Sequence, residues 1–143
     1  MVSFRVEVSI TRTLGLDVGD KRIGVALSDP QGVLASPLTI ISCRNETADI
    51  EAVASIISQN QVERVIVGLP RSMNGSLGKQ AEKVKAFVQS LSSQIKIPVE
   101  FRDERLSSVS ARHLIQDAGR KRVRHDDAIA AALILQTYLD ETE

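Results

Sequence analysis

Two apolar runs that flank a short turn constrain the fold more than any other part of this sequence. Residues 14–29 are LGLDVGDKRIGVALSD, and Gly19 lies in the turn between the runs. Short runs of this kind joined by a glycine-containing turn are typical of paired antiparallel strands. Asp17 interrupts the first run, and a buried carboxylate is costly unless it is paired or binds a metal. Asp17 therefore either caps the turn or holds a cation.

The rest of the chain alternates between strand and helix patterns. Residues 32–41 resemble a third strand, in which Pro37 favours an edge position. A helix capped by Asn45 or Thr47 is predicted to run to about Asn60. Further strands are predicted at residues 62–70 and 97–104, and further helices at about 79–92, 107–119 and 126–139.

This order predicts an α/β fold with a mixed sheet and helices on both faces. Strands that alternate with helices favour parallel pairing, whereas the opening strands are close enough for antiparallel hairpins. A length of 143 residues suits one domain. We expect that domain at 13–143, preceded by an N-terminal extension, 1–12, whose alternating apolar residues indicate a strand or an ordered arm.

Composition excludes several classes of protein. Aromatic residues make up only 3% of the chain, so recognition of single strands by base stacking is not expected. The single cysteine, Cys43, excludes an internal disulfide and a cysteine-rich zinc site, and it fits a reducing cytosol. No apolar run reaches the roughly 20 residues of a membrane span. A cytoplasmic protein without membrane association is therefore expected.

Carboxylates stand at the ends of three predicted elements. Asp17 lies near the end of the first strand, the pair Asp103 and Glu104 closes the strand at 97–104, and the pair Asp126 and Asp127 opens the last helix. They would meet at one edge of the sheet if the first strand and the 97–104 strand were parallel neighbours. Oxygen ligands from several segments are what Mg²⁺ or Mn²⁺ prefers.

Each acidic pair also has a purely structural interpretation. Asp126 or Asp127 could cap the last helix and favour its positive end. The acidic pair at 103–104 could form surface ion pairs with Arg102 or Arg105. Residue type alone leaves both interpretations open.

Four motifs, in this order, resemble those of the YqgF/RuvX family: LGLDVGDKRIGVALSD, VIVGLPRSMNGSLG, FRDERLSS and DDAIAAALILQTYL. Together they run from about Thr13 to Asp140. Members of this family are RNase H-like proteins provisionally named pre-16S rRNA nucleases or Holliday junction resolvase-like proteins. The resemblance implies an RNase H-like fold, a metal-dependent nuclease site and a role in trimming the 5′ end of the small-subunit rRNA precursor.

The resemblance also implies which carboxylates form the site. Matched motif by motif, Asp17, Glu104 and Asp127 would be the catalytic residues and would hold one or two Mg²⁺ or Mn²⁺ ions. The match favours Asp127 over Asp126. It also favours Glu104 over Asp103, although strand alternation alone does not.

Basic and polar residues near these carboxylates are candidate contacts to a nucleic-acid backbone, and such contacts would make binding depend on salt. Ordinary solvated charges at turns, loops and helix ends are the alternative interpretation. Family members often carry an aspartate where Asn74 stands. The candidates are Lys21, Arg22, Arg71, Asn74, Lys79, Arg105, Arg120, Lys121, Arg122 and Arg124.

The expected partner is structured nucleic acid. Precursor rRNA within the small-subunit precursor is the first expectation and branched DNA the second. The protein is expected to be a monomer or a weak homodimer. The alternatives are a Holliday junction resolvase-like DNA endonuclease and a non-catalytic module that binds RNA, the ribosome or a transcription complex.

Overall fold

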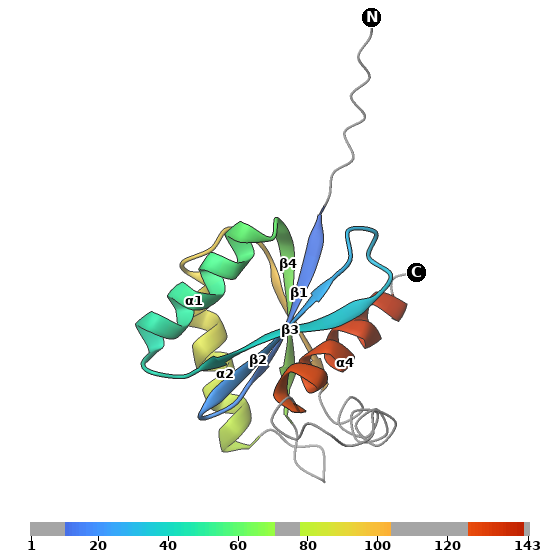
Figure 1. Ribbon diagram of the computed structural model, residues 1–143. Coiled ribbons are helices and arrows are strands. Elements are labelled where there is room, and N and C mark those ends of the chain that lie inside the picture. The colour runs from blue at the N-terminus through green and yellow to red at the C-terminus, as the bar shows by residue number, and fades with distance from the viewer. Residues whose placement is uncertain (1–10, 71–77, 104–125, 142–143) are drawn as a thin grey trace, which may run out of the picture.

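The computed structural model describes residues 11–70, 78–103 and 126–141 (Figure 1). The helix expected at 107–119 and most of the N-terminal extension therefore lie outside the described residues. In chain order the elements are β1 (Arg12–Val18), β2 (Arg22–Ser28), β3 (Ala35–Ser42), α1 (Glu46–Gln59), β4 (Val62–Leu69), α2 (Lys79–Ser92), β5 (Val99–Asp103) and α4 (Asp126–Glu141).

The strands form one mixed sheet in the order β3-β2-β1-β4-β5. β2 is antiparallel to both of its neighbours, β1 and β3, whereas β1, β4 and β5 are parallel. The predicted mixed sheet is thus confirmed. The condition set for convergence of the carboxylates, that β1 and β5 are direct neighbours, is not met, because β4 lies between them. β2 and β4 occupy the two edges of β1, and β5 pairs with the outer edge of β4.

Helices cover both faces of the sheet, as the sequence predicted (Figure 1). On one face α1 and α2 bury a core that includes Leu14, Leu16 and Val67. On the opposite face α4 is the one helix among the described residues that covers β1 and β2, with Ile134 and Leu135 fully buried. None of the described helices is long and apolar enough to cross a membrane.

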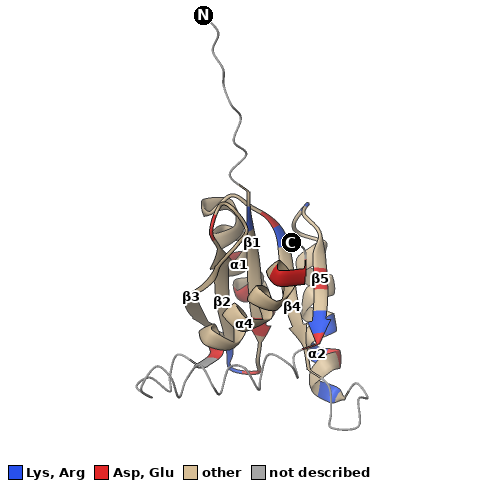
Figure 2. Ribbon diagram, turned by 90° about the vertical axis from the view of Figure 1, so that its right-hand side faces the viewer, with Lys and Arg blue, Asp and Glu red and all other residues tan. Residues whose placement is uncertain are grey.

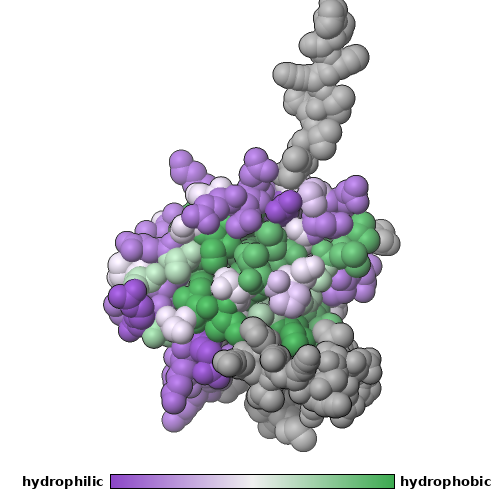
Figure 3. Space-filling model, in the orientation of Figure 1, coloured by the Kyte–Doolittle hydropathy of each residue, from purple (hydrophilic) through white to green (hydrophobic). Residues whose placement is uncertain are grey.

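The predicted position of Pro37 at an edge is confirmed, because β3 is the outermost strand beside β2. The pairing register shifts opposite it, between Val25 and Ala26. The exposed large apolar side chains of the described residues, Val33, Leu34 and Leu38, belong to β3 and the turn before it. Figure 3 shows apolar side chains gathered on this side of the molecule.

The first predicted helix cap is also confirmed. The Asn45 side-chain oxygen accepts a hydrogen bond from the Ala48 N–H at 2.8 Å, which satisfies one of the free donors in the first turn of α1. Asn45, rather than Thr47, is therefore the cap. Gly78 occupies the corresponding position before α2 and offers no side-chain bond.

Candidate functional site

The carboxyl ends of the three parallel strands meet at one end of the sheet. Asp17 is the last residue but one of β1, and Asp103 is the last residue of β5. The register pairs Leu16 with Val67 and Leu69 with Asp103, so these strand ends are level with one another. Figure 2 shows that α4 begins at this same end of the molecule. Ligands of open α/β sheets commonly bind at such an edge.

Asp17 lies on the face of the sheet that α4 covers. A Cβ added to Gly15 would lie 2.8 Å from the Leu135 Cβ, so Gly15 faces α4 directly. Side chains alternate between the two faces of a strand, which puts Asp17 on the same face as Gly15. The strand partner of Asp17 is Gly24 on β2.

Gly24 brings Asp127 to the same place. A Cβ built on Gly24 would lie 1.9 Å from the backbone oxygen of Asp127, so the start of α4 rests directly on the Gly24 backbone. Since Gly24 is paired with Asp17, the first turn of α4 lies beside the end of β1. Two of the three predicted ligands, Asp17 and Asp127, therefore come from segments that the fold brings together.

Asp127 forms an ion pair with a residue that the sequence marked as a candidate for nucleic-acid binding. The Arg22 Nε donates to the Asp127 Oδ2 at 2.8 Å, with the two side chains 57% and 32% exposed. Because α4 begins at Asp126, Asp127 lies inside the first turn and is not the cap. Its carboxylate points toward the guanidinium of Arg22.

Asp103 lies on the other face of the sheet from Asp17. Strand alternation puts Asp103 on the same face as Val99 and Phe101, which pack against the core under α1 and α2. Its neighbour Arg102 faces α4, where its Nε donates to the Glu141 Oε1 at 3.1 Å. Strand register thus separates Asp103 from Asp17. Glu104, which the resemblance favours, lies outside the described residues.

Arg102 is held in place by several contacts on the α4 side. Its guanidinium pairs with Glu100 as well as with Glu141, and it lies 5.1 Å from the centre of the Tyr138 ring. Such contacts fix the orientation of β5 relative to α4. Arg102 therefore serves the packing of the sheet edge against the last helix.

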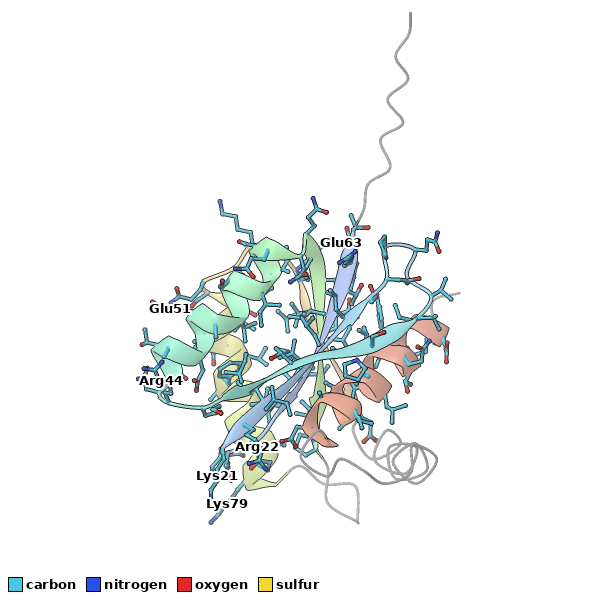
Figure 4. All side chains as sticks on the ribbon, viewed as in Figure 1. Lys21, Arg22, Arg44, Glu51, Glu63 and Lys79 are labelled. Carbon is cyan, nitrogen blue, oxygen red and sulfur yellow. The ribbon has the colours of Figure 1, made fainter. Side chains whose placement is uncertain are left out.

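Three of the candidate nucleic-acid contacts lie together at the site end of the sheet. Figure 4 shows Lys21, Arg22 and Lys79 at the same end of the molecule, with Glu63 at the opposite end. Arg22 and Lys21 belong to the β1–β2 turn region, and Lys79 begins α2. The other candidates lie outside the described residues: Arg71, Asn74, Arg105, Arg120, Lys121, Arg122 and Arg124.

Sequence reasoning missed the residues that join α2 to the β1–β2 turn. The Lys83 Nζ lies 3.3 Å from the Asp20 Oδ1, and the Gln80 side chain donates to the Val18 carbonyl oxygen at 3.4 Å. These residues border a cavity of about 340 Å³ on the α1 and α2 face. One feature of the sequence could have indicated this contact: Lys79 and Lys83 are four residues apart, which puts both lysines on one side of the helix.

The donors that the fold brings together fit a hard divalent cation. Asp17 and Asp127 both offer carboxylate oxygens, and the guanidinium of Arg22 already stands beside one of them as a cationic partner. Within residues 11–70, 78–103 and 126–141, no three Asp, Glu, His or Cys side chains form a group that could hold a metal ion. The third predicted ligand, Glu104, is not among those residues.

Comparison with known sequences points to one family. A family model described as RuvX, Holliday junction resolvase, matches residues 11–141. A protein of Moorella thermoacetica, provisionally named a pre-16S rRNA nuclease, is 50% identical over 132 residues, which cover 90% of this chain and 94% of that protein. A protein of Desulforamulus reducens with the same name is 51% identical over 132 residues, covering 90% and 96%.

Similar solved structures share the fold. RuvC of Thermus thermophilus in complex with a Holliday junction superposes with a TM-score of 0.64 at 14% identity, covering 92% of this chain and 96% of that one. Fowlpox virus resolvase in complex with Holliday junction DNA has a TM-score of 0.56 at 14% identity, covering 92% and 98%. The RNase H-like fold class is thereby confirmed.

Proposed function

Since the chain belongs to the RuvX family, we propose that it is a metal-dependent nuclease that hydrolyses phosphodiester bonds in structured RNA and processes the 5′ end of pre-16S rRNA. The observation that carries the proposal is the approach of the start of α4 to the end of β1 across Gly24. This contact supports a shared site, because it brings the start of α4, which carries Asp127, to the end of β1, which carries Asp17, and ligands are expected at such strand ends.

Three carboxylates would hold the metal. Asp17 and Asp127 supply oxygen ligands from β1 and α4, and Glu104 would supply the third. The metal, Mg²⁺ or Mn²⁺, would provide an activated water and would neutralise the charge that develops on the phosphate. Asp103 is not proposed as a ligand, because its strand register puts it on the opposite face of the sheet.

The neighbouring cations would hold the substrate backbone. Lys21, Arg22 and Lys79 lie at the site end, where they can contact phosphate oxygens on either side of the scissile bond. The basic residues at 105 and 120–124 would extend this contact along the chain. Because aromatic residues are few, recognition would depend on the shape and backbone of the RNA rather than on stacking.

RNA is favoured over branched DNA by the relatives. Proteins about half identical to this chain, and matched over 94% or more of their length, bear a name that refers to pre-16S rRNA. RuvC, whose structure contains a Holliday junction, is only 14% identical and supports the fold alone. The family description does name a Holliday junction resolvase, so junction DNA is the second candidate substrate.

Cleavage of a 5′ fragment of pre-16S rRNA with Mg²⁺ or Mn²⁺ tests the proposal. We expect Asp17→Asn to lower the rate at least about 100-fold, because a metal site is sensitive to the loss of one carboxylate. Asp20→Asn is the matched control: it removes one charge from the same turn, in a side chain that pairs with Lys83, and should change the rate by less than about threefold.

Three other outcomes would redirect the proposal. Metal-dependent cleavage that survives Asp17→Asn would show that the site has been wrongly assigned. Binding of the RNA without cleavage under any divalent metal would favour a non-catalytic module. A four-way DNA junction that is cut, and that outcompetes the rRNA fragment, would make DNA the substrate.

A further inference from the structure

We propose that Arg22 is a positioning residue that couples metal binding to nucleic-acid binding. Its guanidinium holds the Asp127 carboxylate in the metal-free protein. When Asp127 binds a divalent metal, the guanidinium would be released and would bind a phosphate of the nucleic acid. This inference rests on the proposed nuclease function. According to this inference, the Arg22–Asp127 ion pair makes the metal bind first and the phosphate second.

The backbone of Arg22 is fixed, whereas its side chain can move. Its carbonyl oxygen accepts a hydrogen bond from the Gly19 N–H at 2.9 Å, which closes the β1–β2 turn. On the other side, Arg22 is paired with Ser42 of β3. The side chain is 57% exposed, so it can leave Asp127 without any change in the sheet.

The ion pair is of a kind that another cation can displace. It joins residues 105 positions apart in the sequence through one 2.8 Å bond from Nε, and both side chains are in contact with solvent. Exposed pairs of this type contribute little to stability. A divalent ion held by Asp17 as well as Asp127 would attract the carboxylate more strongly than a single guanidinium does.

The released guanidinium would lie close to where a phosphate must pass. Lys21 and Lys79 lie at the same end of the molecule, so two further cations stand near the place where a polyanion would bind (Figure 4). A guanidinium presents a planar fork of N–H donors that matches two phosphate oxygens. Arg22 would therefore exchange one oxyanion partner for another when the metal arrives.

The first test measures Mn²⁺ affinity of the full chain without nucleic acid, by electron paramagnetic resonance titration. We expect Arg22→Gln to bind Mn²⁺ about two- to fivefold more tightly than the wild type, because the competitor for Asp127 is gone. Lys83→Gln is the matched control, since it removes an equal charge and an exposed ion pair with Asp20 at the same end. It should change the Mn²⁺ affinity by less than about 1.5-fold.

An Arg22→Gln protein that binds Mn²⁺ no more tightly than the wild type would overturn the inference. Asp17→Asn identifies the cause of any failure. If wild-type binding depends on Asp17 but not on Arg22, the metal site stands and the coupling is wrong. If Asp17→Asn binds Mn²⁺ as the wild type does, the metal site itself is wrong.

The second test measures the affinity for an rRNA hairpin by fluorescence anisotropy, in EDTA and in Ca²⁺, with the RNA checked for integrity on a gel. In the wild type the affinity should rise on addition of Ca²⁺ by more than in Arg22→Gln, because only the wild type gains a free guanidinium. Arg22→Lys should keep part of the gain, since it keeps the charge and loses the fork. An equal gain in all three proteins would contradict the coupling.

Discussion

The Gly24 Cα lies against the backbone of Asp127 so closely that an added Cβ would be 1.9 Å from the Asp127 oxygen and 2.3 Å from its carbonyl carbon. Both atoms belong to main chain, which cannot rotate away as a side chain could. Any side chain at position 24 must therefore push the start of α4 off the sheet. The same displacement would separate Asp127 from Asp17.

Gly24→Ala is accordingly expected to harm both stability and the site. We expect a loss of about 1–3 kcal/mol in the free energy of unfolding, as for other overpacked positions, together with weaker Mn²⁺ binding. Urea unfolding and Mn²⁺ titration measure the two effects. Gly78→Ala is the matched control, because a Cβ there meets nothing within 4 Å. If a folded Gly24→Ala protein bound Mn²⁺ with unchanged affinity, the start of α4 would not be part of the metal site.

Substitutions of Asp103 and of Glu104 should have very different effects on the cleavage rate. Glu104→Gln is expected to lower cleavage at least about 100-fold, as for the loss of a metal ligand. Asp103→Asn should keep activity within about threefold of the wild type, because the register of β5 turns Asp103 away from Asp17. Cleavage rates under saturating Mg²⁺ compare the two. The reverse pattern would mean that β5 twists at its end enough to exchange the faces.

Features set by neighbouring residues could be predicted from the sequence, and features set by packing could not. The Asn45 cap and the edge position of Pro37 follow from local hydrogen-bonding chemistry, and the structure confirms both. The contact of Gly24 with Asp127 depends on how a helix about 100 residues away along the chain packs on the sheet. No local pattern distinguishes Gly24 from any other glycine in a strand.

The topology of the sheet was likewise only partly predictable from the sequence. Alternating strands and helices predict a mixed sheet, but nothing in the pattern indicates that β4 lies between β1 and β5. Likewise the sequence marks Arg22 as a cation near the site, whereas its partner Asp127 is identified only once α4 is placed. The resemblance supplies the preference for Glu104, and that assignment stays a prediction.

A pH-dependent contribution to stability is expected from Asp29. Its carboxylate accepts from the Val33 and Leu34 N–H groups at 2.8 and 3.2 Å, and these bonds, that of Val33 first, lower the pKa of Asp29 in spite of partial dehydration. A lowered folded-state pKa stabilises the protein above the ordinary pKa of about 3.9, and the effect is lost as the pH falls through the lowered value.

Asp29→Asn keeps an acceptor oxygen but removes the charge, so it isolates this effect. We expect its Tm to lie below that of the wild type at pH 7, with the difference shrinking as the pH falls through the lowered pKa of Asp29. Thermal unfolding between about pH 3 and pH 7 measures it. Glu51→Gln, an exposed position on α1, is the control. A difference in Tm that is constant with pH would point to lost packing in the turn instead.

The thiol of Cys43 should be slow to react. Burial first, and then the negative charge and hydrogen bond of Asp49, raise the pKa of Cys43. Since the thiolate is the reactive form, labelling with a disulfide reagent at about pH 8 should be slower in the folded protein than in urea. Asp49→Asn should move the midpoint of the rate–pH profile to lower pH. Each whole pH step in that midpoint raises the thiolate fraction at about pH 8 by up to about tenfold.

The Asp49 variant is informative because Asn retains an oxygen that can accept the Arg44 N–H, a bond of 3.0 Å that holds the start of α1. Glu46→Gln provides the control, since Glu46 borders the same cavity and is not among the groups that raise the Cys43 pKa. It should leave the midpoint in place. The raised pKa also predicts that the folded state loses stability as the pH rises past the ordinary thiol value of about 8.5, because the unfolded chain ionises first. A midpoint that Asp49→Asn leaves where it is in the wild type would show that Asp49 does not act on the thiol.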